Sequence, residues 1–111
     1  MQLIKQELED GVLEVKLVGS FDIAGAGDVD MEFAVISGTR TKVVVDFNDV
    51  DFLASIGVRV LVKAARSMSN KGGKMALFGA NQTTRNVLAS TGADTLIVVT
   101  DDEPSAVDAV A

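Results

Sequence analysis

Side chains able to do covalent or metal chemistry are scarce in this chain of 111 residues. The absence of cysteine and histidine removes the thiol nucleophile, the imidazole base and the usual zinc ligands. Three neighbouring carboxylates, Asp46, Asp49 and Asp51, are the remaining candidates for a metal site. Because they lack the spacing of a defined metal-binding loop, we expect solvated loop carboxylates, no metal and no cofactor. We also expect that the protein is not an enzyme.

The hydroxyl of Ser55 lies where a strand-like sequence changes to a helix-like one. The β-branched run 43–45 precedes it, and helical spacing of apolar residues begins at Ile56. A serine at such a junction projects from a rigid backbone, and the first helical turn has unpaired N–H groups that would accommodate a phosphate. Ser55 is therefore a candidate phosphorylation site. Its alternative role is an N-cap, whose loss would cost about 1 kcal/mol.

The elements around Ser55 follow from hydrophobic periodicity. Apolar residues alternate in the segments 3–8 and 13–18, and Asp10 and Gly11 between them are typical of a hairpin turn. The remaining spacing predicts helices over 26–36, 56–70 and 83–90, strands over 43–47, 74–78 and 96–99, and a last helix beginning at Pro104. This order predicts a single α/β domain over 1–111, with a mixed sheet of an opening hairpin and parallel βα units packed against helices.

The charge of the chain restricts its partners. A net charge of −6 and a pI near 4.4 would repel nucleic acid and anionic lipid, so we expect neither nucleic-acid nor membrane binding. A protein partner with a basic face fits better, although the acidity would also serve solubility alone. The N-terminus lacks a basic patch followed by an apolar block, which favours a cytoplasmic location. We expect a monomer, or at most a weak dimer.

Residues 44–58, with the sequence VVDFNDVDFLASIGV, resemble the signature of the STAS domain family of anti-sigma factor antagonists. That signature is a hydrophobic strand, an acidic loop and a Ser-containing turn that opens a helix. Further stretches agree at the spacing of the family, namely Gly19 to Asp22, Gly72 to Met75 and Arg85 to Gly92. The resemblance covers most of the chain and implies the STAS fold.

The resemblance also implies a function and a site. In this family a partner that is both an anti-sigma factor and an ATP-dependent serine kinase phosphorylates the serine of the signature, here Ser55, and a phosphatase can reverse the modification. The unmodified protein would hold that partner and so free a sigma factor. An acidic residue near the phosphoacceptor, here Asp22, would shape the binding surface, and it could also cap the first helix. The expected partner-binding residues are Asp22, Ile23, Ala54, Ser55, Ile56, Gly57 and Arg59.

The second helix is expected to carry a basic stripe. By the helical period, Arg59, Lys63, Arg66 and Asn70 share one face, opposite the apolar residues of the same helix. Ile56 would then point outward as an anchor for a partner. The alternative places Ile56 against the loop that contains Asp22.

The signature departs from the family pattern at three positions of this chain: Ala54 replaces the usual Asp, Ile56 the usual Ser or Thr, and Arg59 a small residue. Loss of the Asp would either ease phosphorylation or remove a contact that the kinase uses. An alternative function is therefore a STAS interaction module that is never phosphorylated, for example a scaffold or a subunit of a transporter or secretion assembly. A small-ligand or nucleotide binder is a third reading, but the sequence has no catalytic constellation for it.

Overall fold

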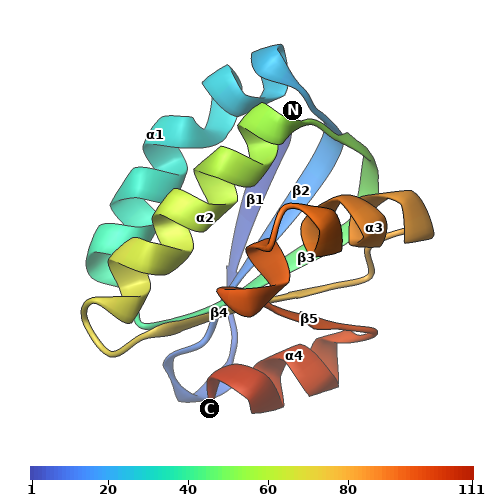
Figure 1. Cartoon of the computed structure of the whole chain (residues 1–111). Helices are drawn as coiled ribbons and strands as arrows, with labels where there is room; N and C mark the ends of the chain where they lie inside the picture. Colours follow the sequence, from blue (N-terminus) through green and yellow to red (C-terminus); the bar gives the residue numbers. More distant parts are fainter.

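The computed structural model describes residues 1–111, and it opens with a hairpin followed by alternating helices and strands (Figure 1). The strands are β1 (Gln2–Glu7), β2 (Leu13–Phe21), β3 (Lys42–Leu53), β4 (Lys74–Phe78) and β5 (Val98–Thr100). The α-helices are α1 (Ile23–Thr39), α2 (Ser55–Ser69), α3 (Gln82–Ser90) and α4 (Glu103–Val110). Short 3-10 turns span Glu9–Gly11 and Ala93–Thr95.

The sheet has the strand order β1-β2-β3-β4-β5. β1 and β2 are antiparallel, because Asp10 and Gly11 adopt the positive φ angles that a tight reversal needs. Every later pair of neighbouring strands is parallel, since each connection contains a helix that carries the chain back to the same edge. The predicted mixed sheet is confirmed.

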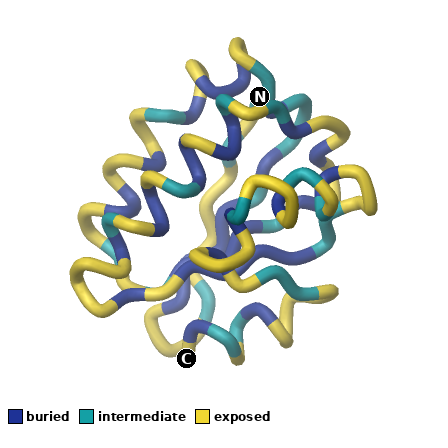
Figure 2. The backbone as a smooth tube through the Cα atoms, viewed as in Figure 1, coloured by how far each residue is buried: buried dark blue, intermediate teal, exposed yellow.

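Helices cover both faces of this sheet (Figures 1 and 2). α1 and α2 pack side by side on one face, over a core that includes Val43, Val45 and Phe47 of β3. α4 covers part of the other face, where its Ala106 packs in a smaller cluster with Val44. β3 is thus buried on both sides over its first half, as its β-branched sequence predicts.

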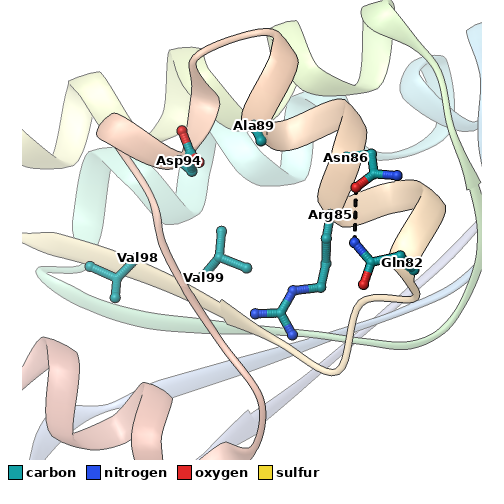
Figure 3. Close-up of a pocket in the computed structure, with 7 residues that line it drawn as sticks. All are labelled: Gln82, Arg85, Asn86, Ala89, Asp94, Val98 and Val99. Carbon is teal, nitrogen blue, oxygen red and sulfur yellow. Dashed lines mark hydrogen bonds between the residues drawn. The ribbon is translucent and has the colours of Figure 1, made fainter.

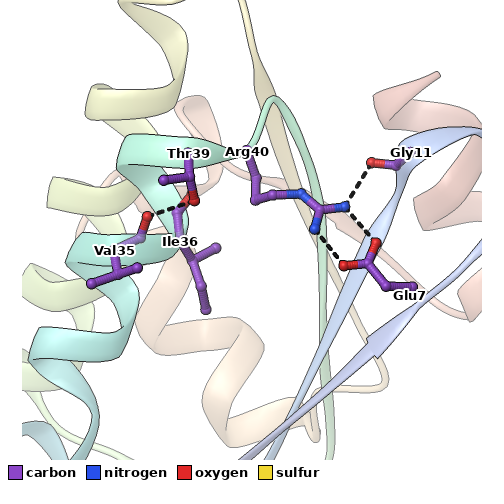
Figure 4. A network of polar contacts seen from close by, with 6 residues as sticks. All are labelled: Glu7, Gly11, Val35, Ile36, Thr39 and Arg40. Carbon is purple, nitrogen blue, oxygen red and sulfur yellow. Dashed lines mark hydrogen bonds and ion pairs between the residues drawn. The ribbon is translucent and has the colours of Figure 1, made fainter.

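A polar contact fastens the hairpin to the end of α1 (Figure 4). The Arg40 guanidinium donates hydrogen bonds of 2.5 and 2.7 Å to the two carboxylate oxygens of Glu7 and one of 3.1 Å to the Gly11 carbonyl. The Arg40 hydrogen bonds lower the pKa of the Glu7 carboxyl from its usual value. This two-pronged geometry fixes where the β1–β2 turn lies relative to the helix.

Several predicted strands have different bounds in the structure, beginning with the hairpin, whose strands span Gln2–Glu7 and Leu13–Phe21 rather than 3–8 and 13–18. The strand expected over 43–47 continues to Leu53, so the expected loop around Asp49 and Asp51 is strand. Its second half pairs with β2 through two register shifts, and Val50 and Leu53 reach the core from it. The last strand begins at Val98 rather than at residue 96, because the preceding residues close the 3-10 turn.

None of the helices combines the length and the apolar composition needed to traverse a lipid bilayer.

Candidate functional site

Ser55 is the first residue of α2, and its side chain is exposed to solvent. The residue before it, Ala54, has an extended backbone with φ −90° and ψ 167°. The N–H of Ala54 donates to the Phe21 carbonyl at 2.9 Å, and the Ala54 carbonyl accepts from the Val58 N–H at 3.1 Å. One residue therefore ends the strand ladder and begins the helix, which holds Ser55 at a rigid junction.

The prediction that Ser55 caps its helix is wrong. Ala54 occupies the N-cap position of α2, and no side chain there accepts a hydrogen bond from the first turn. Ser55 is already helical, one residue beyond the position from which a hydroxyl reaches the N–H groups of the first turn. Its hydroxyl makes no hydrogen bond within the domain, and it is free to react or to bind.

Asp22 has the capping role that the sequence predicts for it. Its side chain accepts a hydrogen bond of 2.8 Å from the Gly25 N–H at the start of α1. Asp22 follows Phe21, which is paired in register with Leu53, so α1 and α2 begin next to each other at the same edge of the sheet. The half-buried Asp22 carboxylate thereby lies beside the junction that presents Ser55.

Gly57 lets α2 approach the end of β2 closely. A Cβ atom at this position would lie 2.7 Å from Cδ1 of the Phe21 ring and 2.8 Å from the Phe21 carbonyl oxygen. The ring itself is fixed, because it is buried and stacks on Phe33 with centroids 6.4 Å apart. Gly57 is thus a packing requirement of the junction and is buried beneath the surface that a partner would touch.

An apolar hollow of about 260 Å³ lies between the starts of α1 and α2. Its lining includes Ile23, which is 81% exposed, and Ile56. Ile56 is half-buried, packs against the core and lines the hollow beside Ile23, the residue after Asp22, which favours the alternative that places it at the Asp22 loop over a fully outward-pointing anchor. Phe52 is 51% exposed only three residues before Ser55, an apolar residue that the sequence pattern does not single out.

The outer face of α2 carries the basic stripe that the helical spacing predicts. Arg59, Lys63 and Arg66 are all exposed on it. They line a hollow of about 420 Å³ together with Val62, Ser67 and Asn70. Lys63 contacts Asp30 of α1 at 3.4 Å, whereas Arg59 and Arg66 take part in no ion pair.

The aspartates of β3 are engaged in separate contacts. Asp49 pairs with Lys16 at 3.0 Å, and the Ser20 hydroxyl donates to Asp51 at 2.8 Å. Asp46 accepts hydrogen bonds of 2.9 and 2.8 Å from the backbone and side chain of Asn48. No group of acidic, histidine or cysteine side chains in the chain is arranged to hold a metal ion.

A further hollow, of about 520 Å³, lies between α3 and β5 (Figure 3). Three of its polar side chains are engaged: Gln82 donates to Asn86 at 2.9 Å, and Arg85 binds Asp101, outside the hollow, at 2.6 Å. The rest of the lining comprises Ala89, Asp94, Val98 and Val99. This hollow shares no residue with the Ser55 junction.

The sequence model of the STAS domain family matches residues 4–106, so the chain belongs to the STAS domain family. Among curated proteins, none matches the sequence significantly.

Solved structures show the same fold. An anti-sigma factor antagonist from Mycobacterium paratuberculosis superimposes with a TM-score of 0.85 at 24% identity, over 98% of this chain and 92% of that chain. The unphosphorylated form of the anti-sigma factor antagonist SpoIIAA gives a TM-score of 0.75 at 17% identity, over 97% and 96% of the two chains. A sulfate transporter family protein from Wolinella succinogenes gives 0.72 at 16% identity, over 94% and 87%. At these identities the comparisons establish the fold, which anti-sigma factor antagonists and a sulfate transporter family protein share.

Proposed function

We propose that this protein is an anti-sigma factor antagonist whose partner binding is switched by phosphorylation of Ser55. The unmodified protein binds an anti-sigma factor that has ATP-dependent serine kinase activity, and phosphorylation releases it. The supporting observation is the free, exposed Ser55 hydroxyl at a rigid strand-to-helix junction within a STAS domain. In the transfer, the Ser55 oxygen takes the γ-phosphoryl group of ATP, ADP leaves, and the hydroxyl proton is released. A phosphatase would restore the serine by hydrolysis.

The surroundings of Ser55 suit a change of binding rather than a change of fold. The N–H groups of the first turn of α2 have no side-chain acceptor, so a phosphate on Ser55 lies at the positive end of the helix dipole, which favours its negative charge. The nearby hollow with Ile23 and Ile56 offers apolar surface to a partner. Close to two negative charges beside that hollow would have to lose water on complex formation, which disfavours the complex.

Binding measurements on three proteins test this proposal. Wild type, Ser55→Ala and Ser55→Glu would be titrated into the purified anti-sigma kinase by isothermal calorimetry. We expect wild type and Ser55→Ala to bind with similar affinity, because both leave position 55 uncharged and the substitution breaks no hydrogen bond within the domain. Ser55→Glu should bind at least about tenfold more weakly, which corresponds to about 1.4 kcal/mol. Equal affinities of all three proteins would contradict a switch at this residue.

A STAS module that binds its partner constitutively is the second candidate. It is favoured by Ala54, which stands where the family pattern has Asp, and by the structural similarity to a sulfate transporter family protein. Such a module would bind its partner equally in the wild-type, Ser55→Ala and Ser55→Glu forms. The same titration therefore separates the two candidates.

A further inference from the structure

Arg59 lies one helical turn after Ser55 on the outer face of α2. Side chains four residues apart on a helix are neighbours, with Cβ atoms about 5 to 6 Å apart. Both residues are exposed, and the Arg59 guanidinium is in no ion pair. A phosphate on Ser55 would therefore lie within reach of the Arg59 guanidinium, which is on the same helix and has no other ion-pair partner.

The same guanidinium belongs to a larger positive surface. Arg59, Lys63 and Arg66 line one hollow of about 420 Å³, although the chain as a whole has a net charge of −6. Among the other arginines, Arg40 binds Glu7 and Arg85 binds Asp101. Lys63 contacts Asp30, so Arg59 and Arg66 supply the unpaired positive charge of this hollow, next to the proposed phosphorylation site.

We propose that Arg59 is a phosphate-binding residue that pairs with phosphorylated Ser55, and that it otherwise contributes to a surface that binds carboxylates of the partner. This surface, the basic face of α2, consists of Arg59, Lys63 and Arg66. Phosphorylation then acts twice, because it places negative charge beside the apolar hollow and neutralises the nearest cation of the basic face. The inference rests on the proposed function and assigns the partner an acidic patch facing α2.

Arginine suits this role better than lysine. Its planar fork can donate to two phosphate oxygens at once, whereas an ammonium acts as a point charge. Only Arg59 is close enough to do so. Lys63 and Arg66 lie about 12 and 16 Å further along the helix axis than Ser55, from the rise of 1.5 Å per residue. We therefore expect Lys63 and Arg66 to bind an acidic partner without changing the pKa of the phosphate on Ser55.

The first test measures the ionisation of the phosphate. Phosphoserine would be incorporated at position 55 of the full chain by an expanded genetic code, and the phosphate titrated by ³¹P NMR. A guanidinium nearby favours the dianion, so we expect the second pKa of the phosphate to be lower in wild type than in Arg59→Gln by about 0.5. The matched control Arg66→Gln should titrate like wild type. Identical titrations of wild type and Arg59→Gln would overturn the proposal.

The second test uses a hexaglutamate peptide as a probe of the basic face. In the unmodified protein, amide resonances around Arg59, Lys63 and Arg66 should shift on addition of the peptide, and Arg66→Gln should weaken these shifts. In the phosphorylated protein the shifts should be at least about twofold weaker. Equal shifts in both forms, or shifts confined to other parts of the surface, would refute the competition. Because the phosphate is installed without a kinase, both tests stand even if no kinase modifies Ser55.

Discussion

The Ser55 hydroxyl makes no contact that the fold needs, although the residue is fixed in place by its backbone. The other three α-helices begin with capping side chains, of Asp22, Asn81 and Asp102, each of which accepts a backbone N–H. α2 begins at Ala54 without such a cap. Modification of Ser55 therefore removes no stabilising interaction from the domain, and the backbone alone sets its position.

Substitutions at two helix starts distinguish a free hydroxyl from a cap. Ser55→Ala should change the free energy of unfolding by no more than about 0.5 kcal/mol, since the side chain bonds to nothing. Asp22→Ala should cost about 1 kcal/mol, because the Gly25 N–H loses its acceptor. Urea denaturation of both variants measures the difference. A loss of about 1 kcal/mol in Ser55→Ala would show that the hydroxyl does cap α2.

A methyl group at Gly57 should separate α2 from β2. The added Cβ would meet the Phe21 ring and carbonyl at less than van der Waals distance, so Gly57→Ala should lower the free energy of unfolding by about 1 to 3 kcal/mol. Gly27→Ala is the matched control, because that position is exposed within α1 and has no atom near the added methyl. There alanine should stabilise the protein by about 0.5 to 1 kcal/mol. Equal effects of the two substitutions would contradict the tight junction.

Among the elements, α2 and β4 are close to prediction. The apolar residues of α2 repeat at the helical period and its other face is basic, so its two faces follow from the sequence, although the helix begins one residue earlier than expected, at Ser55. The second half of β3 is not predictable in this way. Asp49 and Asp51 interrupt the apolar pattern, and only the pairing with β2, through two register shifts, keeps that segment extended.

The contact of β2 with α4 should make the stability depend on pH. Glu14 of β2 is 8% exposed, and burial, aided by the neighbouring Glu103 and by the charge of Asp46, raises the pKa of its carboxyl to about 7. The positive charge of Lys16 lowers the pKa of the same carboxyl, but its effect is smaller. A pKa above the usual value means that the native state binds the proton more tightly than the unfolded chain. The added stability is complete below pH 4.5, the usual pKa, and is lost as the pH rises through about 7.

Urea denaturation between about pH 5 and pH 8 checks this expectation. The free energy of unfolding of wild type should fall by about 2 kcal/mol over that interval. Glu14→Gln should remove most of this fall, whereas Glu32→Gln, at an exposed position of α1, should keep it. A wild-type curve that is flat over this interval would show that Glu14 is ionised in the native protein without cost.

At the scale of the whole molecule, sequence and structure contribute different parts of the site. The STAS signature identifies Ser55 and the strand-to-helix junction, because that motif is contiguous in the chain. The hollow between α1 and α2 joins Ile23 to Ile56, which are far apart in sequence, and it depends on how the two helix starts pack. The turn of Ile56 toward α1 and the exposure of Phe52 likewise required the structure.

The charges of the chain are unevenly distributed over its surface. The chain is acidic, which by itself favours a basic partner, but the basic face of α2 lies next to the proposed phosphorylation site. A partner that covers this end of the molecule would therefore present carboxylates toward α2. Composition alone cannot reveal this, since it averages the two signs of charge over the surface.

Phosphorylation of the protein by its cognate anti-sigma kinase would show whether Ser55 is the switch. Wild type and Ser55→Ala would be incubated with the kinase and ATP, and the sites of modification located by tandem mass spectrometry. We expect one phosphate per chain, on Ser55, none on Ser55→Ala, and loss of the kinase complex once modification is complete. Phosphate on another residue, none at all, or a complex that survives full phosphorylation of Ser55 would contradict the proposed switch.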